Sequence, residues 1–313
     1  MTVTPDVRAF LDQLAAGPAP EPGPLDPVMM RAMFAGAWQR PGPFARIGGV
    51  ADRTVPGPAG EIPVRVYTPE GEGPFPVFVW FHGGGWVIGA LDDNNAMCHE
   101  ICHRTNAVVV SVDYRLAPEN RFPAAPDDCY AVTSWLAEHG AEINVDGTRI
   151  AVGGESAGGN LAAVVSLMAR DRKGPKILLQ LLVSPVTGAP SDGRASYEEF
   201  ADGYFQSRDS MIDFFKLYPR DDEDLQNPYL LPLAADDLTD LPPALVLLGE
   251  CEVLRDEGEE YAHRLGASGT PTELVRYDGQ IHGFFGLLDD KFEIAAVAHE
   301  HAAAALTKAF ATR

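Results

Sequence analysis

Hydrophobic residues near the start of the chain follow a helical pattern. Val7, Phe10, Leu11 and Leu14 recur at the spacing that places side chains on one face of a helix. A linker rich in Gly and Pro follows, and a second helical pattern runs over residues 25–38. The pattern predicts two helices that form an element separate from the rest of the chain.

After Pro41 the hydrophobic residues occur in short runs bounded by Gly and Pro. Residues 62–67 alternate between apolar and polar, whereas residues 77–81 and 108–112 are continuously apolar, as in strands buried on both faces. Further runs of this kind lie at 150–152, 177–183, 245–248 and 274–277. Because helical patterns lie between most of them, we predict an α/β fold with a mostly parallel sheet of about eight strands and helices on both faces.

The interval from 185 to 240 is too long and too aromatic for an ordinary connection between strands. Its aromatic residues include Tyr197, Phe200, Tyr204, Phe205, Phe214, Phe215 and Tyr218. We predict an insertion that helps to cover an active site. Packing of an extra helix onto the core would explain any one of these side chains equally well.

The charge balance excludes some partners. With 45 acidic and 24 basic residues, the formal net charge of -21 would repel phosphate backbones and anionic lipids. We therefore expect neither a nucleic acid nor a membrane as a partner, while a homodimer stays open. The N-terminus lacks the pattern of a secretory signal and no apolar run reaches about 18 residues, so a cytoplasmic location is expected. The four cysteines have no CxxC spacing and are expected to be buried small hydrophobic residues.

The sequence around Ser156 has the spacing of a nucleophile elbow. The segment Gly154-Glu155-Ser156-Ala157-Gly158 lies between a predicted strand and a predicted helix. Glycines two residues before and two after the serine allow a turn too tight for side chains. Ser156 is therefore predicted to project at the C-terminal edge of the sheet as a nucleophile.

A glycine-rich loop, His82-Gly83-Gly84-Gly85-Trp86, directly follows the strand predicted to end at Phe81. We expect the N–H groups of Gly83, Gly84 and Ala157 to converge on the oxygen that gains charge during acyl transfer. A flexible turn would explain a glycine run by itself. Its occurrence together with the elbow favours an oxyanion hole.

His282 follows the last predicted strand and so lies at the same sheet edge as Ser156, where we predict that it acts as the general base. Hydrolases with a serine elbow place the acid between the serine and the histidine in the sequence. The acid is therefore expected within residues 249–258, which follow the strand at 245–248.

Five motifs together resemble the bacterial hormone-sensitive-lipase-like esterases of the α/β-hydrolase superfamily. They are HGGGW at 82–86, VDYRLAPE at 112–119, GESAGG at 154–159, LRDEG at 254–258 and IHGFF at 281–285. The resemblance implies a carboxylesterase that hydrolyses short to medium acyl esters through a Ser-His-acid triad and an acyl-enzyme, with no organic cofactor or metal. It also implies a helical cap, to which we assign residues 1–45, on a catalytic domain of residues 46–313 whose insertion at 185–240 contributes to the cap.

The chain departs from this family at two acidic positions. The triad aspartate of the family corresponds to Glu252, and the usual aspartate before the serine corresponds to Glu155. We choose Glu252 as the triad acid, because a glutamate can also orient an imidazole. Asp256 is expected to begin a helix. Glu250 matches a family glutamate that is not the triad acid, and Asp278 is expected to end a strand.

A competing motif, His99-Glu100-Ile101-Cys102-His103, matches the H-E-x-x-H pattern of zinc hydrolases. Its helix would lead directly into the strand at 108–112, and the sequence offers no obvious third ligand. In the family that the chain resembles this helix is a packing element, so we expect no metal. A ligand receptor on an inactive hydrolase fold is also disfavoured, because the serine, the histidine and the glycine loop are all present.

For the substrate pocket we select side chains of the predicted cap and of the glycine loop: Met33, Phe34, Trp86, Tyr204, Phe205 and Phe214. Met29, Met30 and Trp38 of the second predicted helix are further candidates, since methionine adapts to varied apolar shapes. A helix that only packs against the domain would carry the same residues.

Overall fold

A single eight-stranded sheet organises the protein, for which the computed structural model describes residues 2–17, 26–35 and 42–312. The strands are β1 (Gly49–Gly57), β2 (Gly60–Thr68), β3 (Phe75–Phe81), β4 (Val108–Val112), β5 (Val145–Glu155), β6 (Ile177–Val183), β7 (Ala244–Gly249) and β8 (Thr272–Tyr277). They lie in the order β1-β2-β4-β3-β5-β6-β7-β8. β2 pairs antiparallel with both β1 and β4, and all other neighbours are parallel.

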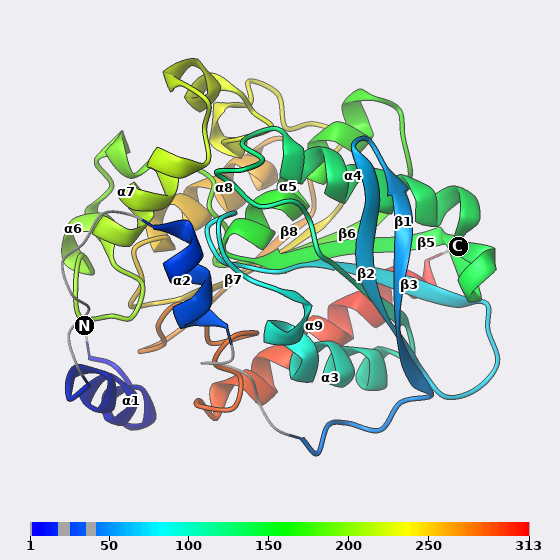
Figure 1. Ribbon diagram of the computed structural model, residues 1–313, viewed down its shortest axis with the longest axis horizontal. Coiled ribbons are helices and arrows are strands. Elements are labelled where there is room, and N and C mark those ends of the chain that lie inside the picture. The colour runs from blue at the N-terminus through cyan, green and yellow to red at the C-terminus, as the bar shows by residue number, and fades with distance from the viewer. Residues whose placement is uncertain (1, 18–25, 36–41, 313) are drawn as a thin grey trace.

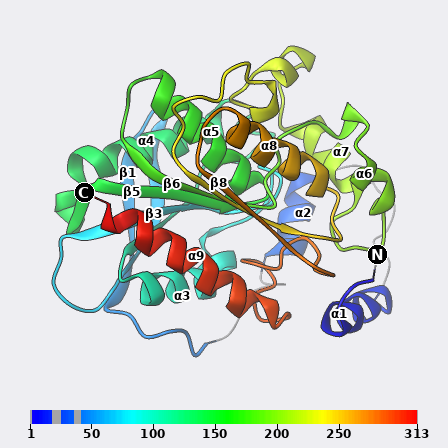
Figure 2. The same ribbon diagram turned by 180° about the vertical axis from the view of Figure 1, so that it is seen from behind.

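Helices cover both faces of this sheet. They are α1 (Pro5–Ala15), α2 (Pro27–Phe34), α3 (Asn95–Thr105), α4 (Ala124–His139), α5 (Ala157–Asp171), α6 (Ala195–Glu199), α7 (Arg208–Leu217), α8 (Arg255–Ala267) and α9 (Ile294–Ala311). Short 3₁₀ helices lie at Leu91–Asn94, Gly140–Ile143, Pro190–Asp192, Asp222–Gln226 and Pro232–Ala234. Figures 1 and 2 show α3 and α9 on one face, and α4, α5 and α8 on the other. The predicted α/β architecture is confirmed.

The apolar runs read from the sequence all form strands. β3 and β4 are buried along their whole length, as their continuous hydrophobic sequence predicts. The hydrophobic pattern did not indicate β1, because this strand is an edge of the sheet and exposes most of its residues. The run at 150–152 is only part of β5, which extends from Val145 to Glu155.

Four helices lie beyond the sheet at one end of the molecule. Figure 1 shows α1, α2, α6 and α7 together at this end, seen from behind in Figure 2. α1 buries Val7 and Leu11, and its Phe10 ring lies 5.9 Å from that of Phe205. The second predicted helix is present as Pro27–Phe34, while Leu25 and residues 36–38 of that prediction lie outside the described residues.

The four cysteines are buried and unbonded to one another, as predicted. Among the helices of the described residues, none is both long and apolar enough to cross a membrane.

Candidate active site

Ser156 lies in the sharp turn between β5 and α5. Its backbone has φ 60° and ψ -120°, a conformation that residues with side chains rarely adopt. The Ser156 N–H donates to the Val183 carbonyl at 2.9 Å, which fixes the turn to β6. A Cβ at Gly158 would collide with the Phe81 carbonyl, and one at Gly154 would collide with the Gly158 backbone. Glycine is therefore required on both sides of the serine, as the elbow spacing predicts.

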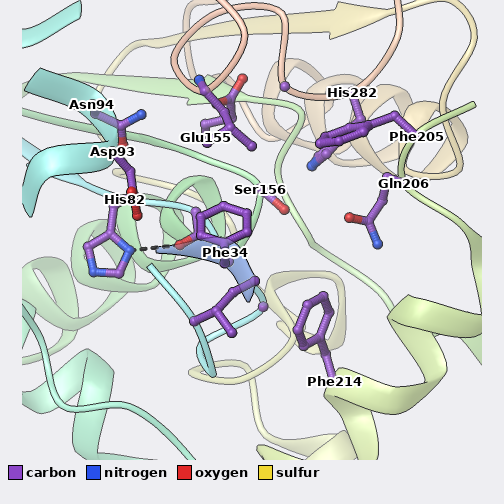
Figure 3. Close-up of a pocket in the computed structure, with 16 residues that line it drawn as sticks. Phe34, His82, Asp93, Asn94, Glu155, Ser156, Phe205, Gln206, Phe214 and His282 are labelled. Carbon is purple, nitrogen blue, oxygen red and sulfur yellow. Dashed lines mark hydrogen bonds between the residues drawn. The ribbon is translucent and has the colours of Figure 1, made fainter. Parts of the chain in front are cut away.

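The serine opens into a cavity of about 70 Å³. The cavity is lined by Phe34, His82, Gly83, Gly84, Gly85, Ile88, Asp93, Asn94, Glu155, Ser156, Phe205, Gln206, Phe214, His282, Gly283 and Leu287. Figure 3 shows His282 with a ring nitrogen directed toward the Ser156 side chain, and Phe34 and Phe214 among the other residues that line this space. Loops at the strand ends, α2, α7 and the segment before α7 thus build one pocket.

His282 is held by a buried carboxylate. Its Nδ1 lies 2.6 Å from Oε2 of Glu252, whose side chain is completely buried. The other carboxylate oxygen accepts hydrogen bonds from Ser184 Oγ at 2.7 Å and from the Gly249 N–H at 2.8 Å. With Nδ1 committed to Glu252, only Nε2 of His282 is available to the pocket and Ser156.

The other acidic candidates have different partners. Asp256 lies in the first turn of α8, where Oδ2 accepts from the Ser196 N–H at 2.8 Å and Oδ1 from Arg255 at 2.8 Å. Glu250 accepts from the Gly279 N–H at 2.8 Å, and Asp278 is exposed. Only Glu252 among these four carboxylates contacts His282.

The surroundings of His282 favour its charged form. Burial lowers the pKa of the ring, but the hydrogen bond that Nδ1–H donates to Glu252 and the charges of Glu252 and Glu155 outweigh it and leave the pKa raised. An imidazolium formed by taking up a proton from Ser156 would therefore be stabilised where it arises.

Glu155 also supports the histidine loop, by which we mean the segment after β8 that carries His282, and the sequence did not indicate this contact. Its carboxylate accepts from the N–H groups of Phe285 and Leu287, both at 3.3 Å. These residues follow His282, so Glu155 ties the elbow to the loop that carries the base. Burial raises the pKa of Glu155, and its hydrogen bonds and the nearby His282 only partly offset this. A carboxylate directly before a nucleophile, inside a buried turn, is the sequence signal that could have indicated this contact.

The glycine loop lies against the elbow. Gly83 and Gly84 line the cavity, and Ala157 is the first residue of α5. Within the described part of the chain, the N–H groups of these three residues donate to no acceptor of the protein. Gly84 has φ +109°, and a Cβ there would collide with the Ile88 carbonyl. The loop therefore depends on glycine at this position.

His82 anchors the start of the loop rather than offering a base. Its Nδ1–H donates to the Gly83 carbonyl at 2.7 Å, and its ring stacks on Tyr114 at 4.2 Å. Burial lowers the pKa of His82 to about 4, so the ring is neutral at pH 7.

The six predicted pocket residues divide into two groups. Phe34, Phe205 and Phe214 line the cavity. Met33, Trp86 and Tyr204 are not among its lining residues. Met33 is 64% exposed, because it lies on the outer face of α2. Trp86 is fully buried and stacks on Tyr218, and Tyr204 packs edge-on against Phe200. Trp38 lies outside the described residues.

The H-E-x-x-H motif lies on α3, where its side chains have other partners. His99 donates from Nδ1 to the Asn95 carbonyl at 2.8 Å and stacks on Phe44. His103 donates from Nδ1 to the Arg46 carbonyl at 2.9 Å, and Glu100 pairs with Arg104. No group of three or more His, Cys, Asp or Glu side chains suited to a metal occurs in the ranges that the structure describes.

Comparisons with known proteins agree with this geometry. A family model described as alpha/beta hydrolase fold matches residues 78–286. The carboxylic ester hydrolase LipN of Mycobacterium tuberculosis is 45% identical over 79% of this chain and 67% of its own length. An arylesterase of Saccharolobus solfataricus is 40% identical over 72% of this chain and 74% of its own. The crystal structure of a thermostable esterase from Pseudomonas putida superposes with a TM-score of 0.93 at 39% identity, covering 100% of this chain and 99% of the other.

Proposed function

The chain belongs to the alpha/beta hydrolase fold family and is a carboxylic ester hydrolase, and we propose that it works through an acyl-enzyme formed on Ser156. The observation that carries this proposal is the 2.6 Å contact between His282 Nδ1 and the buried Glu252. It fixes the tautomer in which Nε2 is free to accept a proton from a neighbouring hydroxyl.

The reaction proceeds in two acyl transfers. His282 accepts the Ser156 proton as the hydroxyl oxygen attacks the ester carbonyl, and the imidazolium then protonates the departing alcohol. A water molecule, deprotonated in turn by His282, attacks the acyl-enzyme and releases the acid. Glu252 keeps its charge throughout and stabilises the imidazolium.

The oxyanion of each tetrahedral intermediate is assigned to the glycine loop and the elbow. The N–H groups of Gly83, Gly84 and Ala157 lack acceptors in the described chain, and two of these residues line the cavity. Fixed donors of this kind stabilise charge as it develops, and they need no reorganisation during the step.

The substrate class is an ester of a short to medium acyl chain. The cavity of about 70 Å³ and the Phe34, Phe205 and Phe214 side chains that line it suit a small apolar group. Two of these rings come from residues 185–240 and one from α2, which supports the assignment of residues 1–45 and part of 185–240 to a cap over the catalytic domain of residues 46–313.

A panel of p-nitrophenyl esters of increasing chain length tests the proposal, run with the wild-type protein and with Ser156→Ala. We expect turnover that peaks at short to medium chains, is stopped by an organophosphonate and falls about 10⁴-fold or more in the variant. Turnover that resists the organophosphonate but is lost with a chelator would overturn the serine mechanism in favour of a metal one.

A further inference from the structure

Helix α2 covers the active site with very little burial of its own. None of its eight residues is buried, and Val28, Met29 and Met33 are 61–67% exposed. The helix nevertheless supplies Phe34 to the pocket lining. Met30 and Phe34 are partly buried and pack against the core, so apolar contacts hold part of one face of α2, and polar contacts can add to them.

One guanidinium supplies such contacts. Arg31 Nε donates to the Val87 carbonyl at 2.8 Å and Nη2 to the Ala117 carbonyl at 2.7 Å. The same side chain forms a two-pronged pair with Glu119, at 2.9 Å and 2.7 Å. This pair lowers the pKa of the Glu119 carboxyl to about 2, so Glu119 stays charged across the working pH range.

The two carbonyls belong to segments that support the glycine loop. The N–H groups of Val87 and Ile88 both donate to the Gly84 carbonyl, at 3.0 Å and 2.9 Å. The Ala117 N–H donates to the Trp86 carbonyl at 2.9 Å, which joins the second segment to the same turn. Arg31 thus binds, from the cap side, the turn that shapes the loop around Gly84.

We propose that Arg31 is a positioning residue that holds α2 over the pocket and braces the glycine loop at the same time, and that it thereby sets the acyl length that the enzyme accepts. The inference rests on the proposed function, because it takes the cavity as the acyl site. When Arg31 is bound, Phe34 closes the pocket and the Val87 carbonyl is fixed. When Arg31 is removed, both are released together.

The contacts to the carbonyls carry this coupling, and the ion pair alone does not. Glu119 is 53% exposed, and pairs between exposed charges contribute little. A guanidinium, in contrast, reaches two carbonyls and a carboxylate at once with its planar fork, and a lysine cannot reproduce that geometry. Different substitutions at this site should therefore have different effects.

The test measures kcat and KM for p-nitrophenyl esters of increasing chain length with four variants. Arg31→Met removes every polar contact, Arg31→Lys keeps the charge, and Glu119→Gln keeps the donors to both carbonyls. Arg8→Met on α1 is the matched control, since the Arg8 side chain pairs with Asp12 at 4.0 Å and both side chains are exposed.

For Arg31→Met we expect KM for short esters to rise about tenfold, kcat to fall severalfold, and the chain-length optimum to move to longer acyl groups. Glu119→Gln should change kcat/KM less than about threefold, because the carbonyl contacts persist. Arg31→Lys should fall between the two, and Arg8→Met should match the wild type. Equal effects of Arg31→Met and Glu119→Gln would overturn the proposal, as would an altered thermal midpoint with unchanged kcat, KM and chain-length optimum.

A double-mutant cycle with Phe34→Ala separates positioning from simple stabilisation. If Arg31 acts by seating α2, Phe34→Ala should add little to the KM of Arg31→Met, because Phe34 has already left the pocket. Multiplicative effects of the two changes would overturn the coupling. Ser156→Ala distinguishes the two proposals: activity in that variant would refute the acyl-enzyme, whereas a failed cycle in an active, serine-dependent enzyme would refute only the role of Arg31.

Discussion

The strand ends and helix α2 both line the same pocket, but they are held in different ways. At the strand ends Glu252 is completely buried, and it accepts from Ser184, from the Gly249 backbone and from His282. In α2 no residue is buried, and Arg31 provides the polar contacts to the domain. The groups that we propose as catalytic are thus fixed by a buried network, whereas α2 is held by the polar contacts of Arg31 and by the partly buried Met30 and Phe34.

This difference separates two kinds of effect. A substitution in the buried network at the strand ends displaces the side chains that we propose take part in the reaction. It should therefore act mainly on kcat. Loosening helix α2 changes the shape and size of the pocket that binds the acyl chain. Such a change should therefore act mainly on KM and on the acyl length that the enzyme prefers. The following changes test that division.

Glu252→Gln should have the largest effect. The amide keeps the size of the side chain but loses its charge, and it can present a donor to Nδ1 and so favour the wrong tautomer. We expect kcat to fall about a thousandfold or more, measured with a p-nitrophenyl ester of optimal length. Glu252→Asp keeps the charge with a shorter reach and should lose at most about a hundredfold. A near-normal rate in Glu252→Gln would remove Glu252 from the mechanism.

Deletion of residues 1–45 should have a smaller effect, and it should change both kcat and KM. It removes Phe34 from the pocket and Phe10 from its contact with Phe205. It also removes the contacts of Thr4 with Gly279 and Gln280, at 3.2 Å and 3.1 Å, in the segment that leads to His282. We expect kcat/KM to fall about tenfold to a hundredfold while circular dichroism shows the sheet intact.

Thr4→Val distinguishes two ways in which the deletion could lower activity: through an open pocket or through a displaced His282. If the cap acts only by closing the pocket, Thr4→Val should behave as the wild type. Valine keeps the backbone N–H that donates to Gly279 but removes the hydroxyl that accepts from Gln280. If the contact with Gln280 also orients the loop that carries His282, Thr4→Val should lower kcat with little change in KM. Full activity of the deletion protein would show that the N-terminal element is dispensable.

The same division explains what the sequence could predict. Ser156 and His282 follow apolar runs that form buried strands, and their positions follow from parallel strands that end at one edge. The need for glycine at 154 and 158 could also be predicted, because neighbouring backbone atoms lie too close to these positions for any side chain. Rules of local sequence therefore give the fold and the elements that carry the chemistry.

The contacts of α2 and of the pocket wall could not be predicted in the same way, because they join residues that are distant in the sequence. Nothing local indicates that Arg31 reaches Val87, or that Met33 faces outward while Phe34 faces the cavity. We expected Trp86 to line the pocket because it ends the glycine loop. Its ring instead packs on Tyr218, a residue distant in the sequence. The contact of Glu155 with residues 285 and 287 was missed for the same reason.

The pH dependence of the rate tests the network at the strand ends, with an expected effect smaller than that of the deletion. Because His282 must be neutral to accept a proton and its pKa is raised, kcat/KM should rise with pH through a midpoint above the ordinary imidazole pKa of about 6.5. Glu155→Gln removes one of the charges that raise this pKa, so its midpoint should lie at lower pH. Profiles between pH 5 and 9 measure both, and a rate independent of pH between 5 and 8 would contradict the role of His282.

Asp256→Asn should have the smallest effect, and it tests the choice of acid most directly. Asp256 lies four residues beyond Glu252, but its carboxylate accepts from the Ser196 N–H and from Arg255. It therefore joins the start of α8 to α6, and it favours the helix by placing negative charge in the first turn. Asparagine retains an acceptor oxygen but loses this charge, at a cost of no more than about 1 kcal/mol in the free energy of unfolding. We expect the thermal midpoint to fall by about 2 °C and kcat/KM to stay within about twofold. A collapse of catalysis in Asp256→Asn together with a normal rate in Glu252→Gln would reverse the assignment of the acid, because only the carboxylate that holds His282 can affect the rate without first affecting the fold.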